Sequence, residues 1–179
     1  MPTLRSSPSV AFARTRRSAG QPGYTPLISY STPIAAPTEP TRALAAYCSD
    51  GRFADYVREF LHRLGLTRVD AVAAAGGPVR LLVPDTEANL FEDVKFLIEA
   101  HGLQRVVLIP HEDCGHYTHR LGLEGVTADA RQIEHLHAAA RRLRESTSVE
   151  RIDLYFLRLT DTGVRFEPVR EATDSPANP

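Results

Sequence analysis

Residues 105–110 read RVVLIP, a run of β-branched and apolar residues that ends at a proline and predicts a buried strand. Two other short runs share this character: RALAAY at 42–47, which is followed by Cys48, and VDAVAAA at 69–75, which is closed by two glycines and a proline. Each has the length of a strand and is bounded by turn residues. We therefore expect three buried strands in the first two thirds of the chain.

Segments with helical spacing of apolar residues alternate with these strands. The pattern predicts helices over 54–64, 85–100 and 127–144, and residues 79–83 predict an extension of the second strand or a separate short strand. The last two strands, 152–159 and 164–169, flank an Asp-Thr-Gly turn and form a hairpin. This order predicts a single α/β domain with a mostly parallel central sheet flanked by helices and an antiparallel hairpin at the C-terminal edge.

Composition excludes several classes of protein. The chain has 179 residues, 42% of them apolar and 24% charged, which is enough to build one hydrophobic core. A net charge of −1 argues against nucleic-acid binding, and two cysteines cannot form a disulfide framework. The uncharged run 18–38 contains four prolines, so we expect no membrane span. Lys95 is the only lysine, which argues against lysine-based covalent chemistry.

The ends of the chain differ from its middle. Residues 1–40 contain seven of the 13 prolines and four arginines but one acidic residue, and they predict an extended or disordered arm. An arm that wraps a partner subunit and a targeting peptide are the alternatives. We expect the folded domain over residues 41–170 and a disordered tail over 171–179.

The two cysteines both follow predicted strands. In a parallel sheet, ligands bind beyond the carboxyl ends of the strands, at the point where the strand order reverses. Cys48 ends the first strand and Cys114 follows the third, three residues after His111. Two thiolates and one imidazole are a typical donor set for Zn²⁺, and three protein ligands with an open fourth position are typical of catalytic zinc. Asp50 and Arg52 can form a charge-assisted pair beside such a site.

Other interpretations remain open at this point. His116 or His119 can supply a fourth ligand, which would make the zinc structural. The cysteines can also be buried small side chains or a disulfide pair, or Cys48 and His111 can act as the nucleophile and base of a hydrolase.

Two motifs resemble those of the β-class carbonic anhydrases, and most closely those of short bacterial proteins of that type. They are Cys-x-Asp-x-Arg at 48–52 and His-x-x-Cys-Gly at 111–115, within a resemblance that covers about residues 42–160. The resemblance implies zinc bound by Cys48, His111 and Cys114. It also implies an Asp50–Arg52 pair that gates the fourth position, with Asp50 itself as the fourth ligand in a closed state. The family forms dimers or higher oligomers, so we expect a homodimer or higher homo-oligomer.

The expected function is hydration of carbon dioxide to bicarbonate by this zinc centre, with His116 and His119 as a possible proton relay. Members of the family carry polar residues where this chain has Ala73-Ala74-Ala75-Gly76-Gly77, and the usual substrate-binding glutamine has no counterpart. The alternatives are therefore a zinc-binding module with weak or no catalysis, and hydrolysis of carbonyl sulfide or carbon disulfide. Because two thiolates neutralise Zn²⁺, we expect activity that rises through mildly alkaline pH. Reduced thiols also fit a cytoplasmic location.

Overall fold

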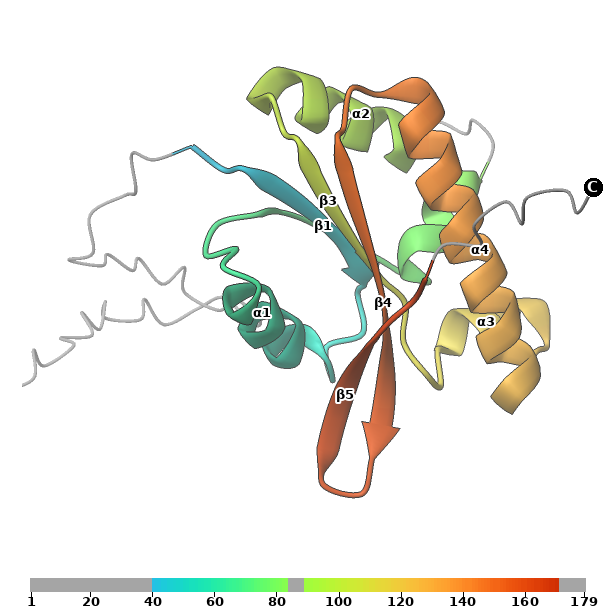
Figure 1. Cartoon of the computed structure of the whole chain (residues 1–179). Helices are drawn as coiled ribbons and strands as arrows, with labels where there is room; N and C mark the ends of the chain where they lie inside the picture. Colours follow the sequence, from blue (N-terminus) through green and yellow to red (C-terminus); the bar gives the residue numbers. More distant parts are fainter. Residues whose placement is uncertain (1–39, 84–88, 171–179) are drawn as a thin grey trace, which may run out of the picture. The chain divides into compact units, whose positions relative to one another are not determined.

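The computed structural model describes residues 40–83 and 89–170 (Figure 1). These residues form a five-stranded sheet with the order β2-β1-β3-β4-β5. The strands are β1 (Ala43–Cys48), β2 (Asp70–Ala74), β3 (Arg105–Ile109), β4 (Arg151–Thr160) and β5 (Gly163–Pro168). The first four run parallel, and β5 pairs antiparallel with β4 at one edge. The structure thus confirms the expected α/β class with its parallel sheet and antiparallel edge hairpin.

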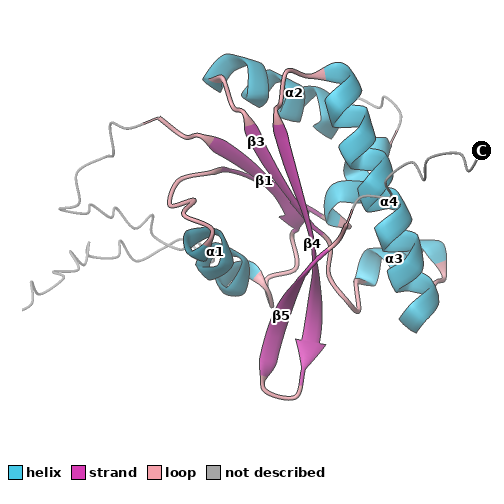
Figure 2. Ribbon diagram, viewed as in Figure 1, coloured by secondary structure: helices cyan, strands magenta, loops and turns pink. Residues whose placement is uncertain are grey.

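Helices cover the two faces of the sheet unequally (Figure 2). Helix α1 (Ala54–Arg63) packs on one face, where a cluster joins its Val57 and Leu61 to Ala45 of β1 and Val107 of β3. Helices α2 (Leu90–His101) and α4 (Gly125–Ser146) pack on the other face, in a larger cluster that includes Leu44, Leu108, Phe91, Ile98 and Leu136. Neighbouring residues of β1 and β3 point to opposite faces, which explains why both strands are almost continuously apolar.

The strand order reverses beside β1. The chain passes from β1 through α1 to β2 on one side, and then crosses over the opposite face through α2 to β3 on the other side. The carboxyl ends of β1 and β3 therefore lie next to each other where the connections diverge, the usual place for a ligand site in this type of sheet.

Two local predictions need correction. Residues 79–83 form no strand, because Gly77–Leu82 is a 3₁₀ helix, η1, with Pro78 at its start. Gly76, its N-cap, and Gly77, its first residue, have positive φ angles (90° and 60°), which turn the chain after β2. In addition, residues 115–121, for which the pattern indicates no element, form the short helix α3 (Gly115–Leu121).

Some expectations fall outside the described residues. These are the arm, apart from Pro40, the tail over 171–179, and the first residues of the predicted helix 85–100. Within the described ranges, none of the helices combines the length and the apolar character needed to cross a membrane.

Candidate metal centre

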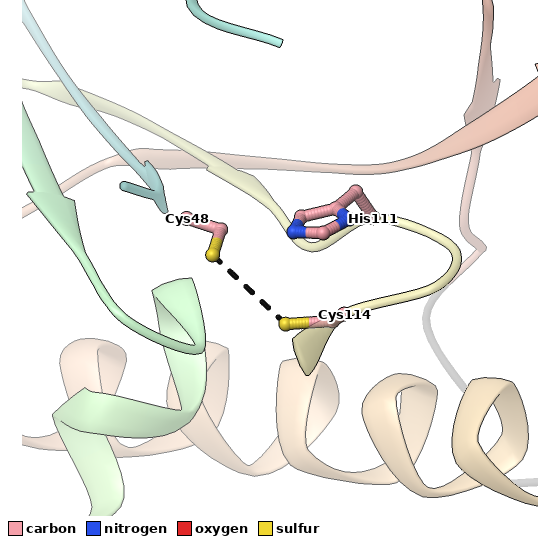
Figure 3. A group of neighbouring side chains, drawn as sticks. All are labelled: Cys48, His111 and Cys114. Atoms are coloured by element: carbon pink, nitrogen blue, oxygen red, sulfur yellow. Dashed lines mark hydrogen bonds between the residues drawn. The ribbon is translucent and has the colours of Figure 1, made fainter. Parts of the chain in front are cut away.

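The structure brings Cys48, His111 and Cys114 together (Figure 3). Cys48 is the last residue of β1, His111 follows β3 by two residues, and Cys114 is the N-cap residue of α3. One ligand atom from each side chain lies within 4.8 Å of the others. Residues 66 positions apart in sequence thus meet because β1 and β3 are parallel neighbours and their carboxyl ends coincide.

Backbone pairing with β4 holds the loop that carries His111. Leu157 N–H donates to the carbonyl oxygen of Pro110 (3.0 Å), and Glu112 N–H donates to the carbonyl oxygen of Leu157 (2.9 Å). The Glu112 carboxylate also accepts a hydrogen bond from the backbone N–H of Leu159 (2.8 Å). His111 therefore sits on an extension of the sheet ladder, although it lies outside β3 itself.

The environment of the His111 ring selects its tautomer. Nδ1 lies 2.7 Å from the carbonyl oxygen of Glu112, so the proton is on Nδ1 and the lone pair is on Nε2. Nε2 is buried and makes no hydrogen bond of ordinary geometry. The ring packs against Phe53, with 4.6 Å between the ring centroids. A buried imidazole nitrogen with a free lone pair and a bonded partner nitrogen is the arrangement of a metal ligand.

The two thiols are close enough to share a proton. The Sγ atoms of Cys48 and Cys114 lie 3.9 Å apart, and the backbone N–H of Gly76 points to Cys48 Sγ at 3.4 Å. The hydrogen bond from Cys114 lowers the pKa of Cys48, and the same thiolate raises the pKa of Cys114. Burial alone would lower the pKa of His111, but contact with the Cys48 thiolate and the Glu112 carbonyl raises it. Negative charge therefore collects on Cys48, where a cation would bind.

Two glycines allow the chain after β2 to pass close to Cys48. A Cβ atom on Gly77 would lie 2.8 Å from the backbone nitrogen of Cys48 and 3.1 Å from the carbonyl carbon of Tyr47. A Cβ atom on Gly76 would meet the His116 ring at 2.8 Å. Only glycine fits both the positive φ angles and these close approaches. The Gly76-Gly77 pair thus shapes the wall of the site and supplies the N–H group to Cys48.

These three residues fit a zinc ion. Their donor set is two sulfur atoms and one imidazole nitrogen, which is the chemistry that Zn²⁺ prefers. The orphaned His111 Nε2 would gain a partner, and a divalent ion would replace the proton shared by the two thiols. Within the described part of the chain, this is the one group of three or more such side chains close enough to hold a metal, and it includes neither Asp50, His116 nor His119.

Asp50 and Arg52 form the predicted pair. The Asp50 carboxylate accepts hydrogen bonds from Arg52 Nε (3.1 and 3.0 Å) and Nη2 (2.8 Å), and from the Arg52 backbone N–H (3.0 Å). The Arg52 guanidinium holds the pKa of the Asp50 carboxyl below its usual range. Arg52 also donates to Asp113, from Nη1 to the carboxylate (3.1 Å) and from Nη2 to the carbonyl oxygen (3.2 Å).

The two histidines of the expected proton relay lie on α3 in different environments. His116 is half-buried, packs beside Gly76, and has a buried Nδ1 without a hydrogen-bond partner. His119 is exposed on the same helix. Tyr117 lies between them in sequence, is 1% exposed and packs in a cluster with Cys114. Its hydroxyl lies 2.9 Å from Nδ1 of His135 on α4, a contact that sequence reasoning missed. No sequence signal pairs Tyr117 with His135, because the contact depends on how α3 packs on α4.

Several solved structures are similar to this chain in outline. A β-carbonic anhydrase of the fungal pathogen Aspergillus fumigatus matches at 14% identity, with a TM-score of 0.49, over 78% of this chain and 77% of that one. A β-carbonic anhydrase of the protozoan Trichomonas vaginalis matches at 19% identity and a TM-score of 0.46, over 74% and 86%. A carbonic anhydrase of Streptococcus mutans matches at 17% identity and a TM-score of 0.48, over 75% and 87%.

No curated protein matches the chain in sequence. A family model described as "Putative carbonic anhydrase" matches residues 38–162, which include all of β1 to β4 and the three candidate ligands. This match covers more than half of the chain and confirms the resemblance carried by the two motifs. The chain therefore belongs to this carbonic anhydrase family.

Proposed function

We propose that this protein hydrates carbon dioxide to bicarbonate with a zinc ion held by Cys48, His111 and Cys114. The observation that carries the proposal is the position of His111: its buried Nε2 has no hydrogen-bond partner, and a nitrogen of its ring lies within 4.8 Å of both sulfur atoms. Zinc bound there would lower the pKa of a water molecule, and its positive charge would stabilise the negative charge that develops in the reaction.

The residues around the ligands have chemistry that suits this reaction. Asp50 is kept ionised by Arg52, so its carboxylate can accept a hydrogen bond from the attacking water and orient it. Apolar side chains that pack around Cys114, among them Val79 and Tyr117, offer a surface that suits a small apolar substrate such as carbon dioxide. His116 packs beside Gly76, whose N–H points to Cys48 Sγ, whereas His119 is exposed. This placement favours His116 for moving a proton from the site toward solvent.

A zinc module with weak or no catalysis is the second candidate. It is favoured by residues 73–77, Ala-Ala-Ala-Gly-Gly, because this stretch has no polar side chain and its two glycines are the residues that lie next to Cys48. Carbonyl sulfide and carbon disulfide are related linear substrates that the same residues can serve.

Metal analysis combined with stopped-flow hydration of carbon dioxide tests the proposal. We expect one zinc per chain, a rate that rises from neutral to mildly alkaline pH, and a fall of at least about 100-fold in kcat for Asp50→Asn. Asp55→Asn, on the exposed first turn of α1, is the matched control and should keep the wild-type rate. If the protein binds one zinc per chain but wild type and Asp50→Asn are equally inactive, the zinc module is favoured. If no zinc is found in the purified protein, and none binds when zinc is added, both candidate functions are refuted.

The second assay of the same samples is hydrolysis of carbonyl sulfide and carbon disulfide. A higher kcat/KM for either of these than for carbon dioxide would assign the substrate differently while leaving the metal centre intact.

We propose in addition that the chain works as a homodimer or larger homo-oligomer in the cytoplasm, as the family resemblance implies. Sedimentation analysis tests the oligomeric state.

A further inference from the structure

Arg52 is shared between two carboxylates from different loops. Asp50 belongs to the turn after β1, which also carries Cys48, and Asp113 belongs to the loop after β3, which also carries Cys114. Nε and Nη2 of Arg52 bind Asp50, while Nη1 and Nη2 reach the Asp113 carboxylate and carbonyl oxygen. A planar guanidinium held on two edges has little freedom to rotate. The Asp113 contacts therefore limit where Arg52 can hold Asp50.

The backbone of Asp113 is held in an unusual conformation. Its φ angle is 57°, and within residues 40–83 and 89–170 it is the one residue other than glycine with a positive φ. Aspartate tolerates this left-handed region better than most residues, but at some cost in free energy. The conformation turns both the carboxylate and the carbonyl oxygen of Asp113 toward Arg52. Such an outlier at a functional loop suggests a role that the loop must maintain.

Asp50 is kept apart from the ligand group. Both of its oxygens accept hydrogen bonds from Arg52, and no oxygen of Asp50 belongs to the group formed by Cys48, His111 and Cys114. A carboxylate released from Arg52 would be free to turn toward a cation bound by that group. The orientation of Arg52 thus decides whether Asp50 competes for the remaining position at the metal.

We propose that Asp113 is a positioning residue, which anchors Arg52 so that Asp50 stays off the metal and the fourth position remains open to a small anionic or neutral ligand. This inference rests on the proposed function, since it assumes a metal at the three ligands. The side chains of Arg52 and Asp113 are 51% and 65% exposed. Exposed ion pairs change an equilibrium by about two- to fivefold, so the Asp113 contact adjusts the balance between two arrangements and does not act as an absolute switch.

Azide binding to the cobalt-loaded full-length protein provides the test. Co²⁺ replaces Zn²⁺ at such sites, and its visible absorption reports a change at the fourth position. We expect wild type to bind one Co²⁺, and Asp113→Asn to bind azide about two- to fivefold more weakly, because Asp50 then competes for the position. Asparagine tolerates a positive φ, so this variant removes the charge without straining the loop. The control Asp55→Asn removes an exposed carboxylate partner of another arginine, Arg58, on α1 and should leave azide affinity unchanged.

A second pair of variants separates positioning from a general structural effect. In an Asp50→Asn background, the added Asp113→Asn change should no longer alter azide affinity, because the competing carboxylate is absent. Unchanged azide affinity in the single variant, or an effect that persists in the Asp50→Asn background, would overturn the inference. If Asp113→Asn fails to take up Co²⁺, then Asp113→Gly, which also accepts the positive φ, is measured instead. Loss of metal in both variants overturns the inference as well, while failure of wild type to bind Co²⁺ refutes the metal centre itself.

Discussion

A methyl group added at Gly77 should disturb the metal centre through the backbone of Cys48. Gly77 and Gly102 have nearly the same φ angle (60° and 61°), so alanine costs about 1–2 kcal/mol in conformational free energy at either position. At Gly102, the C-cap of α2, the new Cβ would have no heavy atom within 4 Å. At Gly77 it would lie 2.8 Å from the Cys48 nitrogen, which is part of the sheet and cannot rotate away.

The magnitude follows from this difference in surroundings. An ordinary contact requires the Cβ atom and the Cys48 backbone to separate by roughly 0.6 Å, and overpacking of this kind costs about 1–3 kcal/mol. We therefore expect Gly77→Ala to lower the free energy of unfolding by about 2–5 kcal/mol, against about 1–2 kcal/mol for Gly102→Ala. A ligand displaced by more than about 0.5 Å leaves productive geometry, so zinc affinity should fall about 10- to 100-fold in Gly77→Ala alone.

Urea denaturation of both variants and zinc competition with a chromophoric chelator measure these two quantities. Gly102→Ala is the matched control, because it introduces the same strain without the contact. Equal unfolding free energies for the two variants, together with wild-type zinc affinity in Gly77→Ala, would show that the close approach between η1 and the end of β1 does not support the site.

The remaining predictions concern a ligand, the core and the ion pair. His111→Ala should abolish stoichiometric zinc binding, measured by metal analysis, whereas His62→Ala on the exposed face of α1 should retain it. Leu108→Ala, at a position that is 0% exposed, should lower the free energy of unfolding by about 2–5 kcal/mol, and a loss below 1 kcal/mol would contradict close packing there. Since Arg52 lowers the pKa of Asp50, their pair stabilises the fold when Asp50 is ionised and loses this effect as pH falls through the lowered pKa. Denaturation of wild type and Arg52→Ala should therefore differ by under about 1 kcal/mol at neutral pH and converge in acid, and a constant difference would argue against the pair.

The sequence was sufficient to predict the strands that carry the site. The apolar runs at β1 and β3 predict buried parallel strands, and the rule that ligands bind at carboxyl ends then brings Cys48 toward the His111–Cys114 loop. The prediction succeeds because it depends on strand order and polarity, which follow from alternating strands and helices. Exact side-chain positions are not needed for it.

Features that depend on contacts between distant segments could not be predicted. The strand expected at 79–83 is a 3₁₀ helix, because two glycines with positive φ and Pro78 favour a tight turn over an extended chain. The left-handed conformation of Asp113 makes sense only beside Arg52, 61 positions earlier in the chain. Helix α3 has seven residues and a largely polar sequence, so its apolar periodicity is too short to recognise.

The register between β1 and β3 would give a bound metal a role in folding. Tyr47 pairs with Ile109, so the two strands must align correctly before Cys48 can meet His111 and Cys114. Sliding β1 by one position would move its last residue by about 3.3 Å and turn every side chain to the opposite face. A misaligned sheet could not bring the three ligands to one ion, whereas the native alignment would gain the free energy of coordination when metal is bound. Zinc binding would thus stabilise the native register of β1 and β3 over shifted registers during folding, in addition to any part it takes in catalysis.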